Sequence, residues 1–173
     1  MNKNPEVEIE TDLGSFKVEL FIEKAPETVN NFLKYVDSGF YNGLIFHFII
    51  PNKCIQAGGF DKNLNYVLPV YNPIKNEADN GLKNEKGTIA MARTIDIDSA
   101  TSQFFINLRD NTEFDFKNKT IEEFGFAVFG KVKEGFEIVE KIGNAPVKYQ
   151  KGYGNMPIKP VEIKNIVVVN QWK

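Results

Sequence analysis

Short runs of alternating apolar and polar residues recur along this chain of 173 residues, whereas helical periodicity occurs in two segments. Residues 6–22 predict a hairpin, because two alternating runs flank the turn-forming stretch DLGS. Further strands are predicted over 44–50, 54–59, 87–92, 102–108, 124–132 and 161–169. Strands and helices do not alternate regularly, so the chain must fold mainly by pairing strands in an antiparallel sheet.

The two helical segments lie far apart in the chain, over 25–39 and 134–143. The apolar residues of the first follow helical spacing: Val29, Phe32, Leu33 and Val36. We predict a mainly β fold, in which the antiparallel sheet closes into a barrel and the two helices cover its open ends.

Two stretches show no long periodic pattern. Residues 61–87 predict an extended surface loop with one short strand at 66–71, and residues 144–160 predict a second irregular segment. Loops of this length inside a compact domain are usually functional. No internal repeat or linker divides the sequence, so we expect a single domain over residues 1–173.

The composition excludes several classes of function. Lys and Arg total 21 against 23 Asp and Glu, which lacks the basic excess of a nucleic-acid-binding protein. One cysteine excludes an internal disulfide, and one histidine excludes a Cys/His zinc site. No apolar run approaches the ~20 residues of a membrane-spanning helix, and residues 1–10 lack the apolar core of a secretion signal. We expect a cytoplasmic, monomeric protein that binds no membrane.

The lone histidine, His47, and the lone cysteine, Cys54, raise the possibility of nucleophilic catalysis. Strand alternation predicts that His47 shares a face with Ile45 and Ile49, while Phe46, Phe48 and Ile50 occupy the other face. A histidine between two isoleucines is more typical of a buried core residue than of a catalytic base, and a lone Cys often fills a small apolar space. A triad also needs a group that orients the base, so hydrolysis is disfavoured.

Other motifs are weak. The stretch QAGGF lacks the spacing of a dinucleotide-binding loop, and the acidic stretches EADN and DIDS lack the spacing of a calcium loop. We therefore predict no cofactor and no metal.

Two glutamines are more informative. Alternation places Gln56 and Gln103 on partly exposed faces of their strands, with Phe105 beside Gln103. Two amides next to an aromatic ring suit a groove that holds peptide backbone and an apolar side chain. Two ordinary surface glutamines explain the pattern equally well.

Several long blocks then stand out: KAPETVNNFLKYVDSGFYNGLIFH, IQAGGF, SATSQFFINL and FAVFGKVKEGFEIVEKI. Together they resemble the cyclophilin-type peptidyl-prolyl cis–trans isomerases, particularly the single-domain bacterial form, over residues 8 to 169. The resemblance implies a closed eight-stranded antiparallel barrel capped by two α-helices, with a substrate groove on its outer wall. It also implies isomerisation of X-Pro bonds in protein folding, with proline-containing peptides or unfolded proteins as partners and no cofactor.

The resemblance assigns roles residue by residue. It implies that Gln56 and Gln103 bind backbone and that Phe105 forms the proline pocket. Members of the family carry an arginine directly after the histidine, whereas this chain has Phe48. The remaining positions implied to bind substrate are Lys53 and Cys54, in places usually held by Phe and Met, with Ala92 and Arg93 on the opposite wall, Phe114 at the rim beside Glu113, and Phe126 where His or Tyr is common.

Phe48 has no hydrogen-bond donor, so we expect a catalytic rate below that of an arginine-containing relative. The alternative is a weakly active or inactive module that binds proline peptides, as a chaperone does. Lys53 or Arg93 could partly replace the missing guanidinium, although Lys53 also suits a solvated turn. A lipocalin-like ligand barrel is disfavoured, because small barrels are filled by their own side chains.

Overall fold

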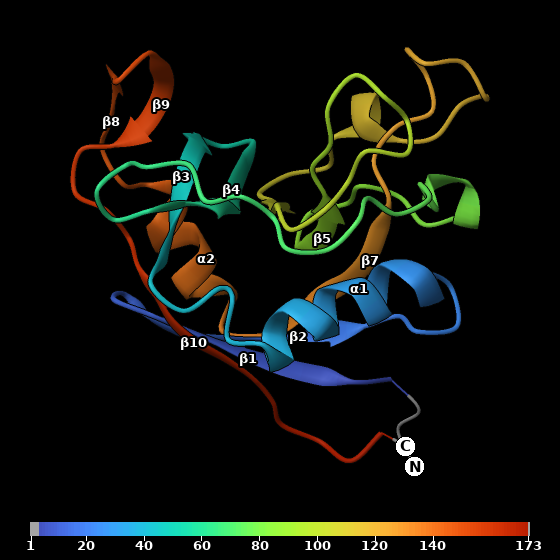
Figure 1. Ribbon diagram of the computed structural model, residues 1–173, viewed down its shortest axis with the longest axis horizontal. Coiled ribbons are helices and arrows are strands. Elements are labelled where there is room, and N and C mark those ends of the chain that lie inside the picture. The colour runs from blue at the N-terminus through green and yellow to red at the C-terminus, as the bar shows by residue number, and fades with distance from the viewer. Residues whose placement is uncertain (1–3, 173) are drawn as a thin grey trace.

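The segments with alternating apolar and polar residues pair with one another as strands. The computed structural model describes residues 4–172 (Figure 1). Eight strands form one antiparallel sheet in the order β10-β1-β2-β7-β5-β6-β4-β3. Their bounds are Glu6–Thr11 (β1), Gly14–Leu20 (β2), Leu44–Ile50 (β3), Cys54–Asp61 (β4), Thr88–Met91 (β5), Phe104–Asn107 (β6), Val128–Glu134 (β7) and Ile163–Val168 (β10).

The two edge strands of this sheet come together and nearly close it into a barrel. Ile45 of β3 forms an isolated bridge with Glu162, which precedes β10. The backbone N–H of Phe46 donates to the carbonyl of Val161 at 3.0 Å, and that of Gly43 donates to Ile163 at 2.8 Å. The predicted eight-stranded barrel is therefore confirmed.

Two helices cover the barrel interior from opposite ends: α1 spans Pro26–Asp37 and α2 spans Phe136–Gly143. On α1, the Asn31 side chain donates to the carbonyl of Thr101, just before β6. On α2, Gly143 lies so close to Leu108, just after β6, that an added Cβ would be 2.6 Å from a Leu108 methyl. Both helices contribute buried apolar side chains to the interior cluster, as their periodicity predicts.

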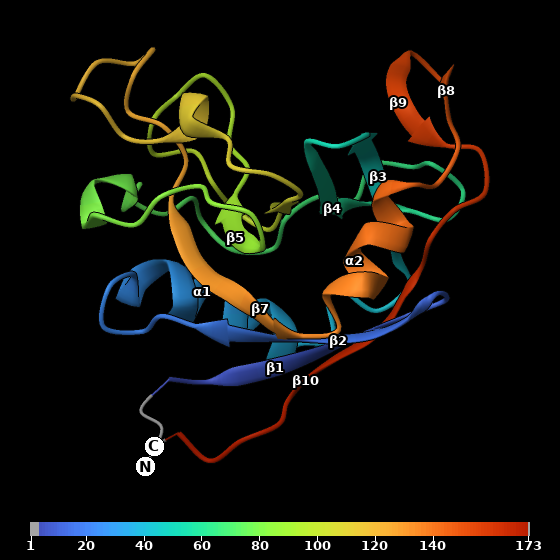
Figure 2. The ribbon, with the colours of Figure 1, turned by 180° about the vertical axis from the view of Figure 1, so that it is seen from behind.

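Two departures from the predicted elements lie in the irregular segments. Residues 66–71 form no strand, although Tyr66 makes an isolated bridge to Phe60. Residues 144–160 contain a missed hairpin, β8 (Val147–Gln150) and β9 (Tyr153–Pro157). Its turn uses Lys151 and Gly152 with φ of 49° and 83°, which is the backbone that two-residue hairpin turns require. Figure 2 shows this hairpin beside β3.

A further correction concerns the faces of β3. The predicted alternation placed Phe46 with Phe48 and His47 with Ile49, but Phe46 and Ile49 both lie in the barrel interior. The β3–β4 ladder is irregular between Leu44 and Phe46 and again between Phe46 and Phe48. Leu44 and Phe46 both lie in the interior, so the first irregularity leaves the alternation of β3 unchanged. The second changes which face the following residues occupy, because Phe46 and Ile49 are both interior although three positions separate them. Among residues 4–172, no helix is long and apolar enough to cross a membrane.

Candidate active site

A row of side chains crosses five strands on the outer face of the barrel. The ladders place Phe48 opposite Gln56, Gln56 opposite Phe105, Phe105 opposite Ala90, and Ala90 opposite Val128. Directly opposite residues in antiparallel strands point to the same side of the sheet. The row thus brings three of the predicted site residues together on one outer surface.

Aromatic rings form the apolar part of this surface. Phe105, Phe114 and Phe126 lie with ring centroids 5.1–5.5 Å apart and in edge-to-face orientation, a favourable geometry for aromatic pairs. Cys54 and Ala92 pack against the same cluster. The five side chains are separate from the barrel interior and form one apolar site that could hold a proline ring.

Two loops must meet to make this cluster, and a buried asparagine joins them. Phe114 ends the short 3₁₀ helix Thr112–Phe114, whereas Phe126 precedes β7. The Asn84 amide donates to the carbonyls of Phe114 at 3.0 Å and Phe126 at 3.3 Å. Asn84 is 2% exposed. Its polar side chain was not predicted to position the site.

The two glutamines lie side by side. The Gln56 amide nitrogen donates to the Gln103 amide oxygen at 2.9 Å, and both side chains are half-buried. Gly59 explains the close approach of Gln103, because an added Cβ at Gly59 would be 2.5 Å from its amide nitrogen. The stretch QAGGF therefore leaves room for the second glutamine, a role that the sequence alone did not reveal.

A cavity of about 140 Å³ lies next to the two amides. Its lining is mostly polar and comes from four segments of the chain: Gln56, Tyr66, Ala92, Arg93, Thr94, Ser99, Thr101 and Gln103. Ala92 and Arg93 thus border both this cavity and the aromatic cluster. The groove has an apolar part and a polar part, with the glutamines between them.

The two cations that could replace a missing arginine are bound to other groups. Lys53 pairs with Glu113 at 3.1 Å and lies 5.0 Å above the Phe114 ring. The Arg93 guanidinium donates to the carbonyls of Gly125 and Thr94, both at 3.0 Å, and lies 5.0 Å from the centre of the Phe126 ring. Lys53 is therefore more than a solvated turn residue.

His47 and Cys54 do not form a nucleophilic pair. Burial raises the pKa of the Cys54 thiol to about 11, so the thiol stays protonated at neutral pH. Burial lowers the pKa of His47 to about 4, and the centroid of its ring lies 4.5 Å from that of Phe60, with the two rings tilted by 37°. Its Nδ1 has no hydrogen-bond partner among residues 4–172. Over the same residues, no three side chains of His, Cys, Asp or Glu lie together as metal ligands would.

Residues 6–168 match the family model described as "Cyclophilin type peptidyl-prolyl cis-trans isomerase/CLD". The chain belongs to the cyclophilin family. It is 48% identical to a peptidyl-prolyl cis–trans isomerase of Acinetobacter baylyi over 165 residues, covering 95% of this chain and 86% of that protein. It is 42% identical to peptidyl-prolyl cis–trans isomerase B of Escherichia coli, covering 94% and 98% of the two chains.

Solved cyclophilin structures agree with this assignment. A cyclophilin-type isomerase of Cryptosporidium parvum matches with a TM-score of 0.78 and 27% identity, covering 97% of this chain and 99% of that one. A second structure of that protein, in the presence of the dipeptide Ala-Pro, matches with a TM-score of 0.77 and 28% identity, covering 96% and 99%.

This cyclophilin departs from the expected pattern on one side of its groove. Phe48 on β3 is half-buried, faces the same side as Gln56 and offers a phenyl ring where an arginine was expected. Lys53 and Cys54 stand where the sequence resemblance implies Phe and Met, and Lys53 is paired with Glu113. On the β6 side, Gln103 accepts a hydrogen bond from Gln56, and Phe105 lies opposite Gln56 in the β4–β6 ladder.

Proposed function

We propose that this cyclophilin binds proline-containing segments in its outer groove and isomerises X-Pro bonds at a reduced rate. The proline ring would lie on Phe105, Phe114 and Phe126, because these rings form the apolar cluster. The flanking backbone would bind Gln56 and Gln103, whose amides have further donors and acceptors beyond their mutual bond.

The chemistry is rotation about a bond, and no cofactor is required. Resonance makes the barrier about 18–20 kcal/mol, and the twisted amide has lost that resonance. A groove that holds the peptide on both sides of the bond accelerates rotation to the extent that it binds the twisted form more tightly than the planar forms. An arginine donor aimed at the proline nitrogen side would add such a difference.

The reduced rate of isomerisation is inferred from one observation, the position of Phe48. Phe48 lies directly opposite Gln56 in the β3–β4 ladder, so an apolar ring occupies the place expected for that donor. Lys53 and Arg93 are engaged by Glu113 and by backbone carbonyls. A charge-assisted hydrogen bond is worth about 1.5–3 kcal/mol, so its absence would slow isomerisation about 10- to 150-fold.

A second candidate function follows from the same residue. A phenyl ring at Phe48 adds apolar contact while removing a donor, which suits a module that binds proline peptides without turning them over. In this case the protein would act as a chaperone or adaptor.

NMR exchange spectroscopy on an Ala-Ala-Pro-Ala peptide separates the two functions. Exchange between cis and trans peptide signals that increases with added protein supports an isomerase. Shift changes without added exchange support a binding module. Phe105→Ala is the matched control, because it removes the central ring and should abolish both effects. An absence of any peptide response in the wild type would contradict both functions.

The monomeric state, the cytoplasmic location, the single domain over residues 1–173 and the lack of nucleic-acid and membrane partners stay predictions.

A further inference from the structure

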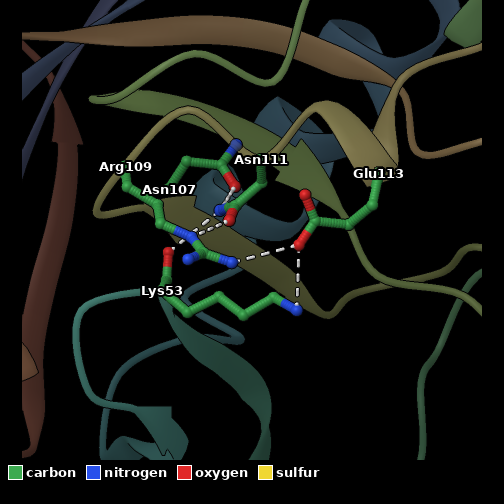
Figure 3. Close-up of polar contacts among 5 residues, drawn as sticks. All are labelled: Lys53, Asn107, Arg109, Asn111 and Glu113. Carbon is green, nitrogen blue, oxygen red and sulfur yellow. Dashed lines mark hydrogen bonds and ion pairs between the residues drawn. The ribbon is translucent and has the colours of Figure 1, made fainter.

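A charged trio lies at one end of the groove. Lys53 Nζ and Arg109 Nη2 contact the same Glu113 oxygen, Oε1, at 3.1 and 3.2 Å (Figure 3). A hydrogen bond from its own backbone N–H, together with Lys53, holds the pKa of the Glu113 carboxyl below its usual range. Two cations therefore share one carboxylate, and one positive charge is left in excess.

Buried amides hold the trio in place. Asn111 is fully buried; its amide nitrogen donates to the Lys53 carbonyl at 3.0 Å and to the Asn107 side-chain oxygen at 2.8 Å. Arg109 Nε donates to the Asn111 side-chain oxygen at 2.8 Å. Asn107, also fully buried on β6, donates to Thr88 on β5 at 2.9 Å. Figure 3 shows these side chains converging on the segment around Lys53.

The trio borders the apolar cluster. Lys53 Nζ lies 5.0 Å above the Phe114 ring, and Phe114 lies 5.5 Å from Phe105. Successive residues of a bound peptide are about 3.8 Å apart. A residue adjacent to a proline on Phe105 can therefore reach the trio with its side chain. The Lys53 ammonium has three N–H donors and the Arg109 guanidinium has five, more than the shared carboxylate oxygen can accept.

We infer that this groove selects X-Pro segments with an acidic residue next to the proline, through Lys53 and Arg109. The inference rests on the proposed function, because it names the substrate class of that same groove. An Asp or Glu carboxylate would accept hydrogen bonds from the two cations beside Glu113. A Lys in the same place would be repelled by the excess charge. On the opposite wall, the positive charge of Arg93 is offset by the negative charge of its neighbour Asp98.

Peptides with alanine flanks and Glu, Lys or Ala on either side of the proline test the inference. Dissociation constants would come from NMR titration in about 0.05 M and about 0.5 M salt. At one of the two positions, the Glu peptide should bind about fivefold tighter than the Lys peptide at low salt, with Ala between them. Exposed charge pairs of this kind typically contribute a few-fold each. The difference should shrink at high salt.

Three variants locate the effect. Glu113→Gln should increase the preference for the Glu peptide, measured as the ratio of the dissociation constant of the Lys peptide to that of the Glu peptide. Arg109→Gln should reduce this ratio. Lys17→Gln removes a comparable ion pair, Lys17–Glu134 at 3.1 Å on β2 and β7, and should leave the ratio unchanged. Thermal unfolding confirms that each variant is folded.

Equal binding of the Glu and Lys peptides by the wild type would overturn the inference and leave the proposed function standing. A Lys17→Gln variant that reduces the ratio as much as Arg109→Gln does would also overturn it, because the effect would then be one of net charge. If no peptide binds, the proposed function fails and the inference fails with it.

Discussion

Phe104 and Phe105 are neighbours in β6, yet they belong to different parts of the molecule. Phe104 is fully buried in the barrel interior, where it contacts Phe32 and Tyr41 with ring centroids 5.5 and 5.4 Å away. Phe105 faces outward and forms the centre of the groove cluster. The interior holds the sheet and helices together, whereas the outer row determines what the groove can bind. Substitutions such as Phe48 and Lys53 fall in the outer part, where they can alter activity without removing the barrel.

The two phenylalanines should therefore respond differently to truncation. Phe104→Ala should lower the free energy of unfolding by about 3–5 kcal/mol, because it leaves a cavity in the interior. Phe105→Ala should lower the free energy of unfolding by less than Phe104→Ala does, since half-buried Phe114 and Phe126 can move into the space. It should nevertheless abolish peptide binding. Urea denaturation and NMR titration give the two quantities. Equal destabilisation with peptide binding intact in Phe105→Ala would break the comparison.

His47 tests burial on the outer side of the sheet, next to Phe60. Its pKa is about 4 in the folded state against about 6.5 in the unfolded chain. Between these values the unfolded state binds the extra proton, so stability falls as the pH is lowered. From about pH 7 to about pH 5, the wild type should lose about 2 kcal/mol more than His47→Gln, measured by urea denaturation. Identical pH dependence in the two proteins would contradict this assignment.

Gly59 separates an effect on the groove from an effect on the fold. Gly59→Ala would place a methyl group 2.5 Å from the amide nitrogen of Gln103, so the Gln103 side chain must shift from the position in which it accepts a hydrogen bond from Gln56. Losing one hydrogen bond from Gln103 to the backbone of the peptide should weaken peptide binding by about 1 kcal/mol, or about fivefold. NMR titration measures this change. Gly152→Ala is a control for the loss of a glycine, because an added Cβ meets nothing within 4 Å there, although its φ of 83° carries its own strain.

The smallest expected change is in the isomerisation rate, when the charge of Lys53 or of Arg93 is removed. Lys53→Ala and Arg93→Ala should each change the residual isomerisation of an alanine-flanked peptide by less than about threefold, because partly exposed ion pairs contribute little. Exchange spectroscopy provides the rate. A much larger loss in either variant would show that its charge replaces the missing arginine after all.

Local patterns predicted much of the fold and part of the site. Alternation correctly separated Cys54 from Ile55 and Phe104 from Phe105, because regular strands turn successive side chains to opposite faces. It was wrong for Phe46 in β3, where irregular pairing changes the register, a feature that depends on the partner strand.

Long-range contacts were harder to predict. The hairpin β8–β9 was missed because its turn, Lys151-Gly152, lacks the common Asn-Gly signal. The pairing of Lys53 with Glu113 joins residues from separate loops. Nothing in the spacing of those residues indicates that buried asparagines bring the two loops together.

The central claim is that Phe48 limits the rate of isomerisation in a groove that still binds the X-Pro peptide. The most direct test compares wild type, Phe48→Leu and Phe48→Arg on one alanine-flanked X-Pro peptide by exchange spectroscopy. Phe48→Leu keeps an apolar side chain and should stay within about threefold of the wild type, since neither residue has a donor. Phe48→Arg should accelerate isomerisation about 10- to 150-fold at similar peptide affinity, and a folded Phe48→Arg variant with the wild-type rate would contradict the claim.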